Sequence, residues 1–336
     1  MIFHFGIQRY QRRNREEAKG YELIETYEEI GDDEEEINKF GLRYREISLK
    51  ELKLDIKLGQ GSNGTVYKGK WRSFVVAVKL ISFESHEEGK LQEIRREMEI
   101  FTRLGNHPNL VPIVGGITTE SNGIYVIMKL CEKGSLYQFL IQEKNEISQE
   151  QFYSILVESS IGLEYLHSEN VIHRDVAARN YLLSSPFKIY LTDFGMSRIL
   201  KEDQDVQSTK MDIGPIRWMA PESIFDSKYS KKSDSYMYAM FMYEVIYRQP
   251  PFHDIGNLLD VSEAVKNGQR PFLDSSIHLS PEIFIVFSKC WDVNPENRYG
   301  LPEIVEMFSK LKYDKYTPED QYHDKRSSSK IEYTHF

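Results

Sequence analysis

Three side chains that carry oxygen atoms lie at short intervals near the middle of the chain. Together they could accept a proton and bind a metal ion. Asp175 and Asn180 lie five residues apart, and Asp193 follows thirteen residues later in an Asp-Phe-Gly triplet. A carboxylate can accept a proton from a hydroxyl group, and carboxylate and amide oxygens are the preferred ligands of hard divalent cations. An aspartate before Phe-Gly also occurs in ordinary turns, so this last motif says little by itself.

A glycine-rich segment, residues 59–66, could bind phosphate. Gly59, Gly61 and Gly64 have no side chains, so backbone N–H groups there could approach phosphate oxygens closely. An ordinary hairpin turn has the same composition. Residues 65–70 then have the pattern of a strand, whereas a dinucleotide-binding fold would need a helix at this point. The segment therefore predicts a strand, a glycine turn and a second strand.

A lysine in an apolar strand is a further candidate phosphate ligand. Lys79 follows a run of valine and alanine and lies on the same face of the predicted strand as Ala77. An edge position or a snorkelling side chain would also explain it. The functional alternative needs a carboxylate partner, and Glu97 lies on or beside the apolar stripe of the next predicted helix.

The periodicity of apolar residues predicts the elements that would position these groups. Strand patterns cover residues 75–81 and 188–192, and residues 110–117 and 124–130 form a predicted hairpin. Helical patterns cover residues 87–104, 149–168, 231–247, 257–267, 281–290 and 301–311. A strand-rich part followed by a helix-rich part predicts an α+β protein in two lobes.

The composition limits the classes of partner and compartment. The 336 residues include 43 Lys and Arg against 52 Asp and Glu, so the formal net charge is −9 and a general nucleic-acid binder is not expected. Cys131 and Cys290 are too few for a disulfide framework and fit a reducing compartment. We recognise neither a signal peptide nor an apolar run long enough to span a bilayer.

Both ends of the chain differ from the periodic part. We expect residues 1–48 to form a charged, poorly ordered extension, with a basic block at residues 9–19 and an acidic block at residues 22–36. The basic block is compatible with weak contact to a membrane surface, and a solvated tail would have the same pattern. We expect the polar tail, residues 313–336, to be disordered.

Taken together, these motifs resemble the protein kinase family over residues 49–312, in particular its tyrosine kinase and tyrosine-kinase-like groups. The glycine-rich loop, Lys79, Glu97, His-Arg-Asp, Asp-Phe-Gly, Ala-Pro-Glu, Asp234 and Arg298 occur in family order. The resemblance implies a small antiparallel sheet lobe with one helix, about residues 49–130, and a larger, mainly helical lobe, about residues 134–312. It also implies ATP-dependent phosphorylation of protein hydroxyls.

By this resemblance each motif residue has a role in phosphoryl transfer. Asp175 would receive the proton of the substrate hydroxyl, Lys79 would contact phosphates and pair with Glu97, and Arg179 and Asn180 would complete the catalytic group. Mg²⁺, or Mn²⁺ in its place, would bind Asn180 and Asp193. The nucleotide would lie against Gly59, Gly61, Gly64, Val66, Ala77, Lys79, Met128, Leu130, Cys131 and Leu182, with Met128 as gatekeeper and a backbone group of Leu130 or Cys131 on the adenine edge.

Further matches to the family would have structural roles only. Phe101, Ile113, His173 and Phe194 match its stacked regulatory residues, and Glu222 with Arg298 matches its buried ion pair.

The residue that accepts the phosphoryl group is less clearly marked. Arg179 occupies a position typical of tyrosine kinases, Ala177 replaces the lysine usual in serine/threonine kinases, and residues 215–219 resemble the substrate loop of tyrosine kinases. However, no tyrosine occurs between Met196 and Met219, and residues 66–71 resemble tyrosine-kinase-like enzymes, many of which act on serine and threonine. We expect tyrosine or dual specificity, with a serine/threonine kinase as the alternative.

Two alternatives from other classes share the fold. A pseudokinase scaffold would lack part of the catalytic set, which is complete here, and a small-molecule kinase would lack the protein-directed substrate loop that ends at Glu222. We expect a cytoplasmic protein, or the cytoplasmic portion of a membrane-anchored kinase.

Overall fold

The computed structural model describes residues 45–61, 64–82, 88–118, 123–142, 146–201, 206–208, 214–274 and 276–315. These residues fall into two compact units. The sheet unit takes the chain up to Ser85 together with Ile113–Leu130, and the helical unit takes His86–Pro112 together with the chain from Cys131 onward. The basic and acidic blocks expected in the first 44 residues lie outside the described residues, as does the end of the polar tail.

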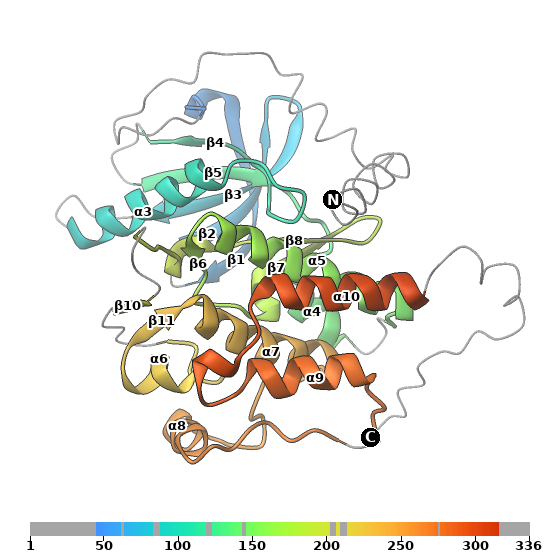
Figure 1. The fold of residues 1–336 in the computed structure, drawn as a ribbon. Coiled ribbons are helices and arrows are strands. Elements are labelled where there is room, and N and C mark those ends of the chain that lie inside the picture. The colour runs from blue at the N-terminus through green and yellow to red at the C-terminus, as the bar shows by residue number, and fades with distance from the viewer. Residues whose placement is uncertain are drawn as a thin grey trace, which may run out of the picture. The chain divides into compact units, whose positions relative to one another are not determined.

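The sheet unit is built on five antiparallel strands in the order β1-β2-β3-β5-β4 (Figure 1). Their bounds are Leu52–Gly61 for β1, Gly64–Trp71 for β2, Phe74–Ser82 for β3, Ile113–Ile117 for β4 and Gly123–Lys129 for β5. The predicted strands and hairpin are thus present. In β3 the valines at 75, 76 and 78 suit a pleated strand because their branched side chains pack well on such a surface.

One face of this sheet carries the core of the unit. Val76 and Val78 of β3 and Ile127 of β5 are fully buried, and they pack with Trp71 and Ile117. Because side chains alternate along a strand, the neighbouring positions 77 and 79 lie on the opposite face. The core therefore fixes which residues of β3 the other face presents.

The sheet unit begins before the boundary expected at residue 49. Glu46 pairs with Gly116 of β4 in a parallel bridge, and Ile47 is buried against the sheet core. The Glu46 carboxylate accepts hydrogen bonds from the backbone N–H and the hydroxyl of Thr118, at 2.7 and 2.8 Å. Residues 45–48 thus cover the edge of β4, whose backbone groups would otherwise be unpaired there.

The helical unit contains the helices predicted from the sequence, with α5 at Gln149–Ser168, α7 at Lys231–Tyr247 and α9 at Pro281–Cys290 as expected. Capping boxes at Ser148 and Ser230 start α5 and α7, because each serine side chain accepts a bond from the third backbone N–H of its helix. Three further helices have bounds close to those predicted: α3 (Glu88–Leu104), α8 (Leu258–Lys266) and α10 (Leu301–Lys315).

Two boundaries differ from the sequence-based expectation. Helix α10 continues through Tyr313 to Lys315, so the first residues assigned to the polar tail are helical. Helix α3, expected in the sheet lobe, groups with the helical unit. The sequence did not indicate the short helices α4 (Leu136–Ile141) and α6 (Pro221–Phe225), because so few residues show no clear periodicity.

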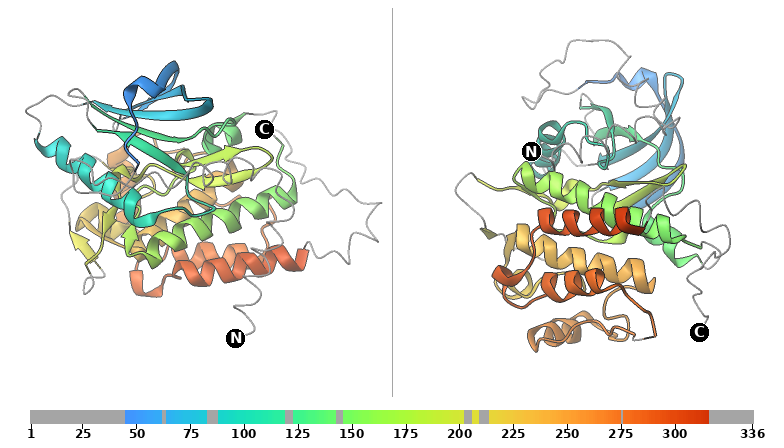
Figure 2. Two further views of the ribbon diagram at one scale, coloured as in Figure 1. Left: turned by 90° about the horizontal axis from the view of Figure 1, so that it is seen from above. Right: turned by 45° about the vertical axis from the view of Figure 1, so that its right-hand side comes forward.

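Helix α7 forms the centre of the helical unit. All its residues from Ser233 to Ile246 are buried, so the helix is covered on every side. Helix α10 lies alongside α5 (Figure 2), and the Lys312 ammonium of α10 donates to the Ser154 hydroxyl of α5 at 2.9 Å. Because α7 is covered on every side, a polar residue in it must find its hydrogen-bond partners within the protein.

Among its described residues, this unit also contains three two-stranded sheets. They pair β6 (Val171–Ile172) with β9 (Arg198–Ile199), β7 (Tyr181–Ser184) with β8 (Lys188–Leu191), and β10 (Val206–Ser208) with β11 (Lys228–Ser230).

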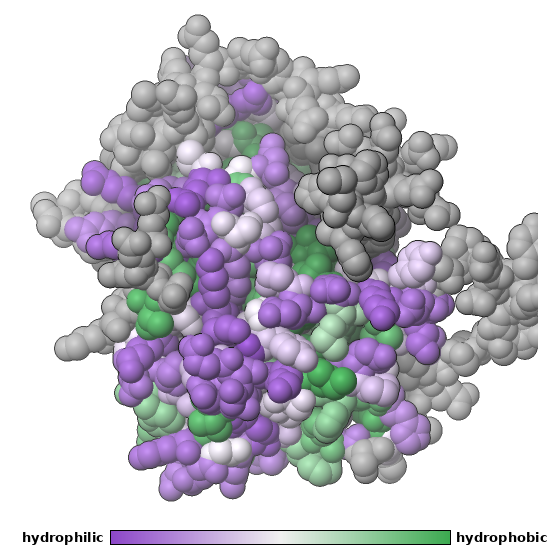
Figure 3. All heavy atoms as spheres, in the orientation of Figure 1, coloured by the Kyte–Doolittle hydropathy of each residue, from purple (hydrophilic) through white to green (hydrophobic). Residues whose placement is uncertain are grey.

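On the face drawn in Figure 3 the surface is largely hydrophilic, with apolar side chains in small separate groups. Among the described residues, no helix is both long enough and apolar enough to cross a bilayer.

Candidate active site

The carboxylate of Asp175 is held by two side chains from the turn that follows it. Asn180 Nδ2 donates to Asp175 Oδ2 at 2.7 Å and also to its backbone carbonyl at 2.7 Å, while the guanidinium of Arg179 pairs with Oδ1. Both partners lie in the 3₁₀ turn Ala178–Asn180, η2, between β6 and β7. These bonds fix the direction of the Asp175 carboxylate, and the residue is mostly buried.

The backbone segments of Asn180 and Asp193 are joined by a hydrogen bond. Thr192, next to Asp193, donates its N–H to the Asn180 carbonyl at 2.9 Å. Since Asn180 uses Nδ2 as a double donor, its Oδ1 is the side-chain atom left for a cation. Asp193 has left-handed backbone angles, φ 62° and ψ 74°. This donor set consists of oxygen atoms only and suits Mg²⁺ or Mn²⁺.

The loop before Asp175 is anchored from below by α7. Asp234 of α7 is fully buried and accepts backbone N–H groups of His173 and Arg174, at 2.7 and 2.9 Å. His167 Nε2 lies 3.0 Å from the same carboxylate. Arg174 has a φ of 68°, and the two bonds to Asp234 help to hold this uncommon backbone conformation.

The ring of His173 links this loop to the Asp-Phe-Gly segment. His173 Nε2 lies 3.1 Å from the Thr192 carbonyl, and its Nδ1 accepts the Asp175 N–H at 3.3 Å. One tautomer, with the proton on Nε2, satisfies both contacts. Phe194 packs edge-on against His173 and against Phe101 of α3, with ring centroids 5.7 and 5.4 Å apart. Three of the four residues expected to stack therefore do so, and Ile113 belongs to the sheet unit.

Arg174 stacks on an aromatic ring from another part of the unit. Its guanidinium carbon lies 3.9 Å from the ring centroid of Tyr229, and both side chains are buried. Tyr229 lies in β11, where it is paired with Gln207 of β10. The arginine before Asp175 is thus packed against the strand pair that includes Ser208.

The candidate nucleotide residues of the sheet unit share one face of the sheet. In the strand register Val66 lies opposite Lys79, and Ala77 lies opposite Met128. Ala77 and Lys79 are two residues apart on β3, so all four side chains are on the face opposite the core. Leu130 follows directly after β5.

The glycines of β1 and β2 differ in whether their surroundings leave room for a side chain. A Cβ on Gly64, where φ is +131°, would come 2.5 Å from the Leu80 carbonyl oxygen, so the backbone itself requires glycine there. At Gly59 and Gly61 a Cβ would meet nothing within 4 Å. The sheet unit therefore does not need glycine at these two positions, where the backbone is open to an approaching group.

The other candidate residues belong to the helical unit. Glu97 lies in α3 beside buried Met98 and three residues after buried Ile94. Cys131 and Leu182 are brought into one neighbourhood because Leu183 of β7 donates its N–H to the Gly134 carbonyl at 2.9 Å and accepts from Lys133 N–H at 3.2 Å. The nucleotide and metal residues are therefore divided between the two units.

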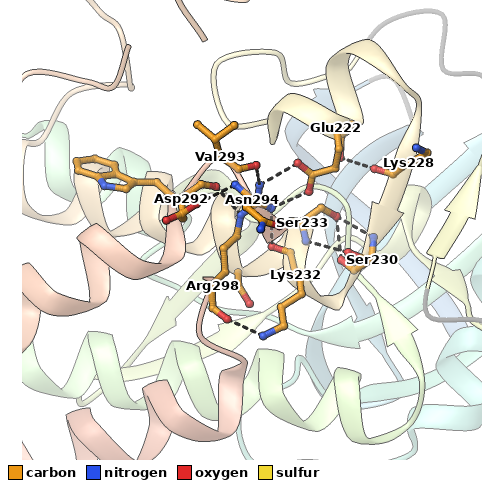
Figure 4. A network of polar contacts seen from close by, with 12 residues as sticks. Glu222, Lys228, Ser230, Lys232, Ser233, Asp292, Val293, Asn294 and Arg298 are labelled. Carbon is orange, nitrogen blue, oxygen red and sulfur yellow. Dashed lines mark hydrogen bonds and ion pairs between the residues drawn. The ribbon is translucent and has the colours of Figure 1, made fainter. Parts of the chain in front are cut away.

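A buried ion pair joins α6 to the segment before α10, as the sequence suggested. Arg298 donates from Nη1 and Nη2 to the two carboxylate oxygens of Glu222, at 2.6 and 2.8 Å (Figure 4). Arg298 also donates to the carbonyls of Asp292, Lys232 and Val293. The Arg298 side chain is wholly buried, and a buried ion pair is stable only when its N–H donors have hydrogen-bond acceptors in this way.

Sequence analysis did not single out Glu244 and Trp218, which lie next to Arg179. A cavity of about 440 Å³ is lined by Arg179, Trp218, Glu244 and neighbouring residues from positions 214–217, with Tyr137, Pro250 and Leu258. The guanidinium carbon of Arg179 lies 4.5 Å from the Trp218 ring centroid. A glutamate within the apolar run of 236–246 was the signal that could have drawn attention to this position.

Comparison with known proteins gives related kinases of two kinds. The family model for protein tyrosine and serine/threonine kinases matches residues 52–308. The chain is 30% identical to the serine/threonine-protein kinase STY17 of Arabidopsis thaliana and 33% identical to the tyrosine-protein kinase TXK of Homo sapiens, in each case over 79% of this chain. It is 34% identical to the tyrosine-protein kinase Fer of Mus musculus over 77% of this chain.

The matched region makes up only part of each relative. It covers 45% of STY17, 49% of TXK and 30% of Fer, so the chain corresponds to less than half of each of these proteins. The family match nevertheless covers most of this chain and includes the sheet, the loop with Asp175 and the helices that support it. The chain belongs to the protein tyrosine and serine/threonine kinase family.

Proposed function

We propose that this kinase transfers the γ-phosphoryl group of Mg-ATP to a hydroxyl of protein substrates, with tyrosine or dual specificity. The observation that carries the proposal is the Asp175 carboxylate, which Arg179 and Asn180 fix from one side. A positioned carboxylate can orient the substrate hydroxyl and accept its proton. Lys79 and Glu97 belong to the proposal as a phosphate ligand and its carboxylate partner.

The residues present fit the nucleotide and the metal. Gly59 and Gly61 leave the backbone open to a ligand, and Lys79 shares the face of the sheet opposite its core with Val66, Ala77 and Met128. The oxygen atoms of Asn180 and Asp193 would hold the cation. Bound Mg-ATP supplies the phosphoryl group and a positive charge that offsets the charge on the phosphates. Leu130, Cys131 and Leu182 would complete the adenine contacts.

The preference for tyrosine rests on the surroundings of Arg179. Arg179 lies between the Asp175 carboxylate and the Trp218 ring. Position 177 holds a fully buried alanine in place of the lysine that is usual in serine/threonine kinases. The cavity beside Arg179 is lined by Pro215, Ile216 and Trp218, which suits an extended substrate with an apolar residue near the acceptor. A tyrosine hydroxyl, which reaches farther than that of serine, would reach Asp175 from such a position.

The serine/threonine alternative has support from the comparisons. STY17 is named a serine/threonine-protein kinase, and its identity to this chain, 30%, is close to the 33% of TXK. Specificity for one acceptor therefore has to be measured.

The deciding experiment incubates the purified protein with Mg-ATP and a mixed peptide array and identifies the phosphorylated residues by mass spectrometry. We expect phosphotyrosine, and we expect Asp175→Asn to lose the signal. Product that contains only phosphoserine and phosphothreonine would move the kinase to the alternative class. No phosphate incorporation under Mg²⁺ or Mn²⁺ would point to a pseudokinase scaffold.

The setting of the enzyme is also a proposal. Cys131 and Cys290 are both buried and form no disulfide within the described residues, which fits a reducing compartment such as the cytoplasm. The described residues do not identify the protein substrates. Residues 9–19, for which we expected weak contact with a membrane surface, lie outside the described residues.

A further inference from the structure

Glu244 is a carboxylate inside the buried helix α7, and its hydrogen bonds run to two segments beside Arg179. Its Oε2 accepts the backbone N–H of Ala178 at 2.8 Å and the indole N–H of Trp218 at 2.9 Å. Only 2% of the residue is exposed. Within the described part of the chain its other oxygen, Oε1, accepts no hydrogen bond, and Glu244 lines the cavity next to Arg179.

These two bonds close a ring of contacts around Arg179. Ala178 is the first residue of η2 and directly precedes Arg179, so Glu244 holds the turn at its start. Trp218 supplies the ring that Arg179 stacks on. A change at Glu244 would therefore alter both supports of Arg179, which in turn holds the Asp175 carboxylate.

The charge of Glu244 also bears on Asp175. Burial raises the pKa of Glu244 from 4.5 to about 7, although the bonds from Ala178 and Trp218 and the charge of Arg179 lower it. The titratable and charged groups around it are Asp175 and Arg179 from the loop and turn, Arg217 from the segment before α6, and Tyr137 from α4. The charge of Arg179 thus acts on the Glu244 carboxylate, while Arg179 forms its ion pair with Asp175.

We propose that Glu244 is a positioning residue of the kinase: its ionised carboxylate holds η2 through Ala178 and orients Trp218, and so keeps Arg179 where it pairs with Asp175. When Glu244 carries a proton, it is a weaker acceptor for the Ala178 and Trp218 N–H groups, so its hold on η2 and on the ring beside Arg179 loosens. The inference rests on the proposed function, because it concerns the proton that leaves the substrate.

The test compares the pH dependence of turnover in wild type and Glu244→Gln, with a peptide that the wild type phosphorylates in the array. The amide keeps an acceptor oxygen for Ala178 and Trp218 but has no charge. We expect the ratio of wild-type to variant kcat to be near one at about pH 5.5 and to reach about tenfold at about pH 8.5. The ratio cancels titration of nucleotide and peptide, which both proteins share.

Two further variants refine this test. Trp218→Phe retains a ring for Arg179 but removes the indole donor that lowers the pKa of Glu244, so the midpoint of the pH step should move upward. Glu306→Gln removes a charge from an exposed position on α10 and should leave the profile unchanged. If Glu244→Gln fails to fold, an unmoved midpoint in Trp218→Phe overturns the proposal.

A second readout does not depend on activity. The indole N–H signal of Trp218 in nuclear magnetic resonance spectra, assigned by its loss in Trp218→Phe, should shift with a midpoint near pH 7 in wild type and stay fixed in Glu244→Gln. A constant ratio of kcat across the pH range overturns the positioning role while the kinase assignment stands. An inactive wild type with a titrating indole signal instead rejects the proposed function, and the catalytic part of this inference with it.

Discussion

The loop with Asp175 and the sheet face with Lys79 are held in place by different physical means. In the helical unit, two carboxylates of the same buried helix, Asp234 and Glu244, bind backbone N–H groups at both ends of the loop, from His173 to Ala178. In the sheet unit, strand register alone places Val66, Ala77 and Lys79 on one face. The loop therefore depends on individual polar side chains, whereas the sheet face depends on the apolar core behind it.

This difference predicts where single substitutions act. A residue that fixes the loop should affect both stability and turnover, because its removal leaves buried N–H groups without a partner. A residue of the sheet unit that only leaves the backbone open, such as Gly61, should affect ligand binding with little change in stability. The substitutions below test this contrast, from the largest expected effect to the smallest.

Asp175→Asn should have the largest effect. The amide cannot accept the proton of the substrate hydroxyl, so we expect kcat to fall by about 10²–10⁴-fold while the affinity for ATP stays nearly unchanged. Steady-state kinetics and a separate nucleotide-binding titration measure the two quantities. Turnover close to that of wild type would mean that Asp175 is not the proton acceptor.

Asp234→Ala should cause the largest loss of stability. It leaves the N–H groups of His173 and Arg174 buried without an acceptor and removes the partner of His167, so we expect about 3–5 kcal/mol less free energy of unfolding. Urea denaturation measures this loss. Asp226→Ala, at an exposed position on the same unit, is the control and should cost less than about 0.5 kcal/mol.

The ionisation of Glu244 should oppose folding. Because its folded-state pKa is raised from 4.5 to about 7, its contribution to stability is fully present below about pH 4.5 and is lost as the pH rises through 7. Glu244→Gln does not titrate, so its stability relative to wild type should be greater at pH 8 than at pH 4.5, by up to about 3 kcal/mol. Denaturation at both pH values measures the difference, and equal differences at the two values would contradict it.

Gly64→Ala and Gly61→Ala should distinguish a glycine that the fold of the sheet unit requires from one that nucleotide binding requires. The first places a Cβ 2.5 Å from the Leu80 carbonyl oxygen at a φ of +131°, so we expect a loss of about 2 kcal/mol of stability. The second meets nothing within 4 Å and should change stability by less than about 0.5 kcal/mol while it raises KM for ATP. If both variants lose stability equally, Gly61 serves the fold and not the nucleotide.

The sequence predicted the longer elements well and the short ones poorly. Helices 149–168 and 281–290 match the structure because each has enough turns to show its apolar periodicity, whereas helix 231–247, buried on every side, is marked by its length and by the serine at its start. The three-residue strands β10 and β11 and the five-residue helix α6 were not predicted, since segments this short depend on tertiary contacts. The side-chain types near Asp175 were likewise predictable, whereas their mutual geometry was not.

The order of motifs in the sequence by itself determined the family and the α+β class, because it preserves the residue types that phosphoryl transfer needs. Only the tertiary structure revealed the part played by α7. Asp234 and Glu244 lie ten residues apart on this helix, and their partners are about 60 residues away in the chain, at His173 and Ala178. No local pattern contains such a pairing. It arises because a buried carboxylate must find donors inside the protein, and the packing of α7 against the loop decides which donors those are.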